Sequence, residues 1–199
     1  MTAKHGIAAG AAAATLLLAL TGASRPAQAY SLEGPTWAGR TTTIDYAVAG
    51  QPNTTFSSAL RQALVIWNAK SAFKWSMAYR VANPCASSGP VGAALRTTDC
   101  GRAFGSGVLG ITTYWYDGAN HFIHAGTVFN ANANFSIYDG PLQRRPDFRR
   151  VAIHEMGHAL GLGHENNSSI PAIMQPFTSD TDRPTWDDIR GIRAMYGAP

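Results

Sequence analysis

Three histidines, His154, His158 and His164, lie in one short stretch of the chain and restrict the structures that it can adopt. His154 and His158 are four residues apart, so on a helix both imidazoles project from one face, about one turn apart. At that spacing both rings can reach one tetrahedral zinc ion. Glu155 lies beside them, where its carboxylate can take a proton from water at the metal. The stretch therefore predicts a helix that carries a catalytic metal.

Gly161 and His164 extend this pattern. Two histidines alone would also be explained as a solvated or core-packed pair. A helix that simply continued would carry His164 away from the metal, whereas a sharp turn at Gly161 brings it back as a third ligand. Three protein ligands leave one coordination position open for water and substrate, which distinguishes a catalytic zinc from a structural one.

Residues 154–164, HEMGHALGLGH, resemble the HExxHxxGxxH signature of the metzincin metallopeptidases. Residues 172–176 (AIMQP) resemble the Met-turn of that clan, and residues 186–192 with Tyr196 and Gly197 resemble the closing helix of matrixins. The resemblance implies an α+β fold of the zincin type. We expect a twisted mixed sheet backed by two helices, with the zinc helix across an active-site cleft and a small C-terminal subdomain below it.

The same resemblance implies roles for further residues. Met174 would lie beneath the zinc, and Leu109, Gly110 and Pro176 would bind substrate, with an edge strand at Leu109 and Gly110 holding an extended peptide by main-chain hydrogen bonds. An ordinary core methionine is the alternative for Met174. One catalytic zinc is expected, and calcium is a candidate stabilising ion by resemblance alone. The expected activity is hydrolysis of peptide bonds in a protein or peptide substrate, with Glu155 as the base.

The sequence departs from matrixins at several positions. Glu165 follows the third histidine, as in astacins, where vertebrate matrixins have serine, and Thr178 replaces a tyrosine of the specificity pocket wall. The pattern for a second, structural zinc is missing, so we interpret His121 and His124 as strand-surface histidines rather than ligands. No cysteine-switch prodomain of the matrixin type precedes the expected catalytic segment, which leaves the control of latency open.

The first 29 residues predict a secretory signal peptide. Lys4 precedes an apolar run over residues 7–20, and residues 27–29 (AQA) form a small-residue cleavage pattern. A membrane anchor is the alternative, but the run is shorter than the roughly 20 residues that a spanning helix needs. We therefore expect cleavage after Ala29, a secreted, extracellular protein without stable membrane association, and one catalytic domain over residues 30–199.

Cys85 and Cys100 are the only cysteines and lie in a segment rich in Gly, Ser, Asn and Pro. In an oxidising compartment such a pair is expected to form a disulfide. A metal ligand or nucleophile is the alternative, but neither cysteine has a partner at ligand spacing.

Alternation, β-branched and aromatic runs, and helical spacing outline the remaining elements. Strands are expected over residues 41–48 and 73–81, and a hairpin over residues 108–116 and 121–130. Helices are expected over residues 56–67, from 146 to about 160, and behind Thr185, where Asp188 is the capping-box partner. Residues 82–107 are interpreted as a loop that carries the disulfide.

The charge pattern argues against a nucleic-acid partner. Arg144, Arg145, Arg149 and Arg150 lie just before the expected zinc helix, where we interpret them as a solvated helix start, and no basic cluster interleaves with aromatic residues. A monomer is expected. The alternative function is a secreted, non-catalytic binding module with this zinc fold, which would have no need for Glu155. A deaminase or amidase is disfavoured because its ligand patterns are missing.

Overall fold

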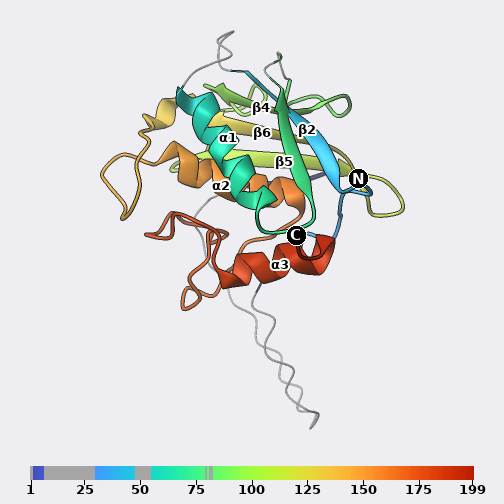
Figure 1. Ribbon diagram of the computed structural model, residues 1–199. Coiled ribbons are helices and arrows are strands. Elements are labelled where there is room, and N and C mark those ends of the chain that lie inside the picture. The colour runs from blue at the N-terminus through green and yellow to red at the C-terminus, as the bar shows by residue number, and fades with distance from the viewer. Residues whose placement is uncertain (1, 7–29, 48–54, 79, 81–82) are drawn as a thin grey trace, which may run out of the picture.

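A mixed β-sheet forms one layer of the molecule (Figure 1). The computed structural model describes residues 2–6, 30–47, 55–78, 80 and 83–199. The sheet has the strand order β1-β5-β6-β4-β2-β3. Its hairpin β5–β6 and the pair β1–β5 are antiparallel, whereas β6–β4, β4–β2 and β2–β3 are parallel. The strands are β1 (Thr2–Gly6), β2 (Thr41–Ala47), β3 (Lys74–Ala78), β4 (Val91–Arg96), β5 (Gly110–Tyr116) and β6 (Phe122–Asn130).

Strand β4 lies inside the segment that the sequence predicted as a loop, so that prediction was wrong over Val91–Arg96. Half of its six residues are Gly or Ala, which have low strand propensity, and the segment shows no alternation between polar and apolar residues. Its first four residues are buried because the strand lies between β6 and β2. Neighbouring strands rather than local sequence therefore determine its conformation.

Two helices cover one face of the sheet, as the predicted fold required (Figure 1). Helix α1 (Thr55–Asn68) buries Ala59, Leu60, Ala63, Leu64 and Trp67, which recur at helical spacing. Helix α2 (Phe148–Leu160) packs against α1 and β5 and is buried along its whole length. Indole Nε1 of Trp67 donates to the Ile153 carbonyl over 2.9 Å, which joins the two helices.

Helix α3 (Trp186–Tyr196) and the irregular segment before it form a small lower part of the molecule (Figure 1). Its predicted capping box is confirmed, because the Thr185 amide donates to the Asp188 carboxylate over 2.7 Å. At the other end, the Tyr196 hydroxyl donates to the Leu160 carbonyl over 2.8 Å. The Tyr196 bond attaches α3 to the end of α2.

Cys85 and Cys100 form the predicted disulfide, with their Cα atoms 5.4 Å apart. The bridge closes the segment that contains β4. Next to it, Pro84 lies directly on the sheet, since a Cβ at Gly126 would be 1.8 Å from the Pro84 carbonyl oxygen. Glycine at position 126 is what allows this close approach.

The predicted signal peptide lies mostly outside the described residues, as do the end of the first predicted strand at Val48 and the turn over residues 50–53. Strand β1 is an exception: it consists of residues that the sequence predicted to be removed, and it pairs with the outer edge of β5 from Thr2↔Trp115 to Gly6↔Ile111. Among the described residues, no helix is long and apolar enough to span a bilayer.

Candidate metal centre and active site

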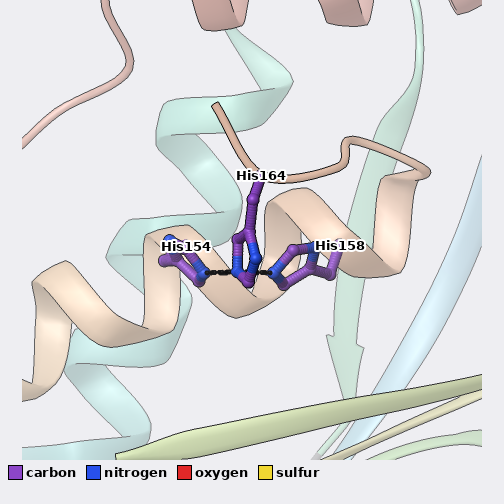
Figure 2. A group of neighbouring side chains, drawn as sticks. All are labelled: His154, His158 and His164. Atoms are coloured by element: carbon purple, nitrogen blue, oxygen red, sulfur yellow. Dashed lines mark hydrogen bonds between the residues drawn. The ribbon is translucent and has the colours of Figure 1, made fainter. Parts of the chain in front are cut away.

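Helix α2 positions the first two histidines. Its N-terminus is capped by Asp147, whose carboxylate accepts hydrogen bonds from the amides of Arg149 and Arg150. From there the helix continues without interruption through His154 and His158, and both side chains project from the same face (Figure 2). Both are buried in the protein.

Gly161 ends the helix with the sharp turn that the sequence predicted. Its φ of 103° lies in the left-handed region, and the amide of Leu162 returns to the Gly157 carbonyl over 3.0 Å. A Cβ at position 161 would be 2.7 Å from the Pro35 carbonyl oxygen, so both backbone angle and space require glycine there. The turn brings His164 back over the helix (Figure 2).

The three histidine Nε2 atoms converge on one point. They are 3.0 Å apart for His154 and His158, 3.1 Å for His158 and His164, and 3.3 Å for His154 and His164. Zinc–nitrogen bonds of about 2.0–2.1 Å in a tetrahedral site place the ligand nitrogens about 3.3 Å apart. The donor set therefore fits zinc. It is the one group of three or more potential metal ligands among the residues that the structure describes.

The other ring nitrogens of the buried histidines are held by backbone carbonyls. Nδ1 of His154 lies 2.7 Å from the Ile173 oxygen, and Nδ1 of His158 lies 2.8 Å from the Leu162 oxygen. A proton on each Nδ1 leaves Nε2 free for the metal. Burial, followed by the charge of His164, lowers the pKa of His154 to about 3, so this ring is neutral and able to bind metal at neutral pH.

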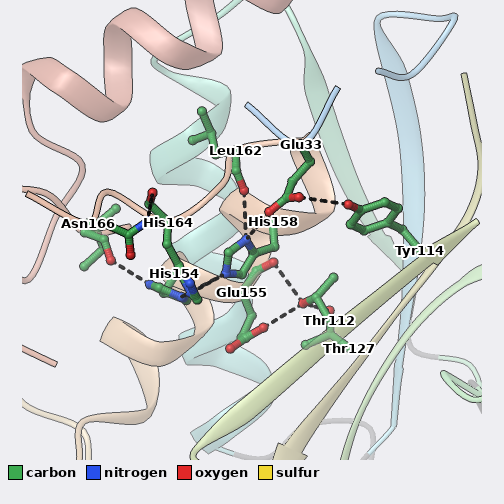
Figure 3. Close-up of polar contacts among 11 residues, drawn as sticks. Glu33, Thr112, Tyr114, Thr127, His154, Glu155, His158, Leu162, His164 and Asn166 are labelled. Atoms are coloured by element: carbon green, nitrogen blue, oxygen red, sulfur yellow. Dashed lines mark hydrogen bonds and ion pairs between the residues drawn. The ribbon is translucent and has the colours of Figure 1, made fainter. Parts of the chain in front are cut away.

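Glu33 approaches the centre from the N-terminal segment (Figure 3). Its Oε1 lies 3.9 Å from Nδ1 of His158, and its Oε2 accepts a hydrogen bond from the Tyr114 hydroxyl over 2.9 Å. At this distance Glu33 is a nearby negative charge rather than a hydrogen-bond acceptor, and the Leu162 carbonyl remains the group that orients the His158 ring. Sequence reasoning missed Glu33 because its contact with His158 depends on the tertiary fold.

Glu155 is fully buried beside the three histidines, and β5 holds its carboxylate. The hydroxyl of Thr112 donates to Glu155 Oε2 over 2.7 Å (Figure 3). Gly110 makes room for the side chain, because a Cβ there would be 2.8 Å from Oε1 and 2.9 Å from Cγ. Burial raises the pKa of Glu155 to about 8, and the Thr112 hydrogen bond opposes this shift.

Met174 lies directly under α2. It is buried, and a Cβ at Gly157 would be 2.4 Å from its sulfur atom. The turn that holds it is fixed by Asp188, whose carboxylate accepts from the amides of Ile173 over 2.9 Å and Met174 over 3.2 Å. Because the Ile173 carbonyl contacts His154, Asp188 stabilises one metal ligand through this turn.

The carboxyl groups of Glu165 and Asp187 contact each other. Both are buried, and Glu165 also accepts from the Asn167 amide over 2.7 Å. Burial, then the charges of Glu165 and Asp188, raise the pKa of Asp187 to about 6. The glutamate that replaces the matrixin serine is thus an interior residue that links the third histidine to α3.

Three residues were predicted to bind substrate: Leu109, Gly110 and Pro176. Gly110 begins β5 and is buried, and Leu109 precedes it and packs on the core. The pairing of β1 along β5 ends at Ile111, so Leu109 and Gly110 lie just beyond it. Pro176 is half-buried, after the Met174 turn.

Two interpretations of charged residues were wrong. Arg144 and Arg145 are exposed, but Arg149 and Arg150 are buried at 8% and 2% exposure, because the start of α2 is packed inside the protein. His124 is fully buried rather than on the strand surface, with Nδ1 3.1 Å from the Gly89 oxygen.

Comparisons with known proteins agree with this geometry. The family described as Matrixin matches residues 91–197. Metalloendoproteinase 1 of Glycine max is 32% identical over 182 residues, which are 82% of this chain and 53% of that protein. Macrophage metalloelastase of Oryctolagus cuniculus is 51% identical over 53 residues, 25% of this chain and 11% of that protein.

Matrix metalloproteinase-15 of Homo sapiens is 49% identical over 53 residues, 25% of this chain and 8% of that protein. The chain thus spans about half the length of the soybean relative and about a tenth of the two mammalian ones. The family match covers more than half of the chain and includes all three histidines, Glu155 and Met174. With the histidine geometry, it shows that this chain belongs to the matrixin family.

Proposed function

We propose that this protein is a secreted, zinc-dependent endopeptidase. The observation that carries the proposal is the convergence of three imidazole Nε2 atoms within 3.0–3.3 Å, with the Glu155 carboxylate buried beside them. His154, His158 and His164 would hold the ion. Zinc, when bound there, supplies a Lewis acid that makes water more acidic and polarises a carbonyl group.

Glu155 would move the proton in this reaction. Its carboxylate takes a proton from the attacking water and later delivers it to the leaving amine. The Thr112 hydrogen bond fixes one carboxylate oxygen, and Gly110 leaves the space in which the other can act. Met174 would form an apolar floor under the metal.

The outer edge of β5 supports the binding of an extended peptide. Residues 2–6 pair antiparallel with Ile111–Trp115 through the backbone, and this pairing supports the proposal that the edge can accept a substrate strand. A substrate would use the same edge with main-chain hydrogen bonds, and Leu109, Gly110 and Pro176 would contact it near the metal. Removal of residues 1–29 as a signal peptide would leave this edge open in a secreted monomer of residues 30–199.

The decisive experiment is to incubate the purified secreted protein with an unfolded protein and to map the cleavage sites by mass spectrometry. We expect internal cleavage that stops with a chelator and returns with zinc. Glu155→Ala is the matched control, since it keeps all three ligands. A protein that binds one zinc per chain but cleaves nothing under any of these conditions would favour the alternative of a non-catalytic binding module.

A further inference from the structure

A short N-terminal segment, residues 31–33, pairs antiparallel with residues 161–163, the turn that leads to the third histidine. Backbone hydrogen bonds of 2.8 and 2.9 Å join the two stretches. Gly163 permits the close approach, because a Cβ there would be 2.8 Å from the Ser31 hydroxyl oxygen and 3.3 Å from Oε1 of Glu33. The segment therefore brings a carboxylate to the metal-binding turn.

The Glu33 carboxylate is held beside His158 (Figure 3). The Glu33 side chain is 11% exposed, and the Tyr114 hydroxyl donates to its Oε2 over 2.9 Å. Burial, followed by the charge of Glu33, raises the pKa of Tyr114, so the hydroxyl keeps its proton and remains a donor at neutral pH. Oε1 of Glu33 lies 3.9 Å from Nδ1 of His158, the ring nitrogen that does not face the metal site.

The carboxylate acts on His158 by its charge. Nδ1 of His158 lies 2.8 Å from the Leu162 oxygen, and that contact already orients the ring. A negative charge near Nδ1 makes Nε2 a stronger electron donor and attracts a cation held by that atom. The three ligands are neutral imidazoles when they bind metal, so they do not balance the charge of a divalent ion. Because the His158 side chain is 1% exposed, water screens this attraction only weakly.

We propose that Glu33 is a positioning residue for the metal, whose charge increases the zinc affinity of the three-histidine centre. Residues 31–33 carry this charge to His158, and Tyr114 holds it in place. The inference rests on the zinc centre of the proposed function and not on turnover. Coupling free energies are reciprocal, so an ion that Glu33 attracts must also stabilise the paired N-terminal segment. The segment and the metal centre are therefore coupled.

The first test measures zinc dissociation constants by competition with a chromophoric chelator. Glu33→Gln has the same shape and keeps an acceptor for the Tyr114 hydroxyl, so it removes the charge alone. We expect zinc affinity to fall about 10-fold, the lower end of the range for loss of a partner behind a metal ligand. Glu33→Asp, which keeps the charge at a greater distance, should lie between the two. Asp117→Asn is the matched control, since it removes one charge from the β5–β6 turn, and it should bind zinc like wild type.

Substitution with cobalt separates the effect of charge from a change of structure. The visible absorption bands of bound Co²⁺ distinguish tetrahedral from octahedral coordination. Glu33→Gln should keep the tetrahedral bands of wild type, because the Leu162 carbonyl still orients His158. Loss of these bands together with loss of affinity would show that Glu33 only maintains the structure, and would overturn the proposal.

The second test measures the coupling itself, by hydrogen exchange of the Gly163 amide, which donates to the Ser31 carbonyl. Zinc should slow this exchange about 10-fold more in wild type than in Glu33→Gln, the same factor that separates their zinc affinities. If Glu33→Gln does not fold, Tyr114→Phe, which releases the carboxylate without removing it, should show a smaller loss of affinity. Equal zinc affinity and equal exchange in wild type and Glu33→Gln overturn the role of Glu33 and leave the zinc centre intact. Wild type that binds no zinc overturns the proposed function itself.

Discussion

The hydroxyl of Thr112 donates a hydrogen bond to the carboxylate of Glu155, with 2.7 Å between Oγ1 and Oε2. Thr112 lies on β5 and Glu155 on α2, so the bond connects the sheet to the metal-binding helix at the group proposed to move the proton. Oε2 is thereby held in place, while Oε1 is buried without a hydrogen-bond partner among the described residues. This arrangement leaves one oxygen to meet water at the metal.

Thr112→Val should lower activity without loss of zinc. The substitution removes a hydrogen bond that opposes the upward pKa shift of Glu155, so the ionised base should form at higher pH. We expect kcat/KM to fall roughly 10-fold, the scale of one hydrogen bond to a charged group, and the acid limb of its pH profile to move upward. Thr113→Val, the neighbouring position on β5, is the control. An unchanged acid limb would show that Thr112 has only a structural role.

Substitution of the proposed base, Glu155, should have a different effect from substitution of a metal ligand, His158. Glu155→Ala should keep zinc but lose roughly 10²-fold or more in kcat, because a general base is removed. His158→Ala should lose zinc affinity, activity and some thermal stability, because bound metal contributes free energy to the folded state. Metal analysis after dialysis, together with peptide cleavage, distinguishes the two. Near-normal cleavage by zinc-loaded Glu155→Ala would exclude Glu155 as the base.

In the metal-free protein, the contribution of Glu155 to stability should fall as pH rises. Its unfolded-state pKa is near 4.5 and its folded-state pKa about 8, so between these values the folded state binds more protons than the unfolded state. The part of the free energy of unfolding that Glu155 contributes then falls with increasing pH across this window, and comparison with a Glu155 variant cancels the contribution of the histidines. Urea unfolding in the presence of a chelator should show that Glu155→Gln is increasingly more stable than wild type from pH 4.5 to 8. A constant difference over this range would contradict the raised pKa.

Much of the fold and of the metal centre was predictable because the relevant signals are local. The spacing of His154 and His158, the glycine at 161 and the capping box at Thr185 each act within a few residues, and the structure has all three features. Likewise, β5 and β6 are rich in β-branched and aromatic residues on either side of a turn, and they form the predicted hairpin.

The missed features depend on tertiary contacts. Strand β4 is held by its neighbours, and Arg150 is buried because α2 is enclosed on all sides. Glu33 reaches His158 only after the N-terminal segment has packed against the end of α2, where its amide donates to the Gly161 carbonyl. No local sequence pattern marks such contacts. A charged residue next to the metal-binding motif, such as Arg150, can nevertheless be buried when the helix that carries it is enclosed.

Asp188→Ala should weaken both the fold and metal binding. The substitution leaves the amides of Ile173 and Met174 without their acceptor, and each unsatisfied buried group costs about 1–3 kcal/mol. Because the Ile173 carbonyl orients His154, zinc affinity should fall as well. Denaturant unfolding and zinc competition with a chromophoric chelator measure the two effects. Unchanged zinc affinity in a destabilised variant would show that the turn supports the fold alone.

Gly110→Ala should remove activity while leaving zinc and backbone structure in place. Gly110 has no left-handed φ, so alanine is compatible with the backbone, but its Cβ would lie 2.8–3.0 Å from the Oε1, Cγ and Cδ atoms of Glu155. Glu155 is fully buried and must turn away, which breaks its Thr112 hydrogen bond and displaces the base from the metal. We expect kcat to fall by roughly 10²-fold, close to the loss in Glu155→Ala, with zinc content unchanged. Gly118→Ala is the matched control, because nothing lies within 4 Å of a Cβ at that turn position, and it should retain wild-type activity. If Gly110→Ala cleaves peptides at the wild-type rate, the position of the Glu155 carboxylate does not limit the reaction, and the role assigned to it must be revised.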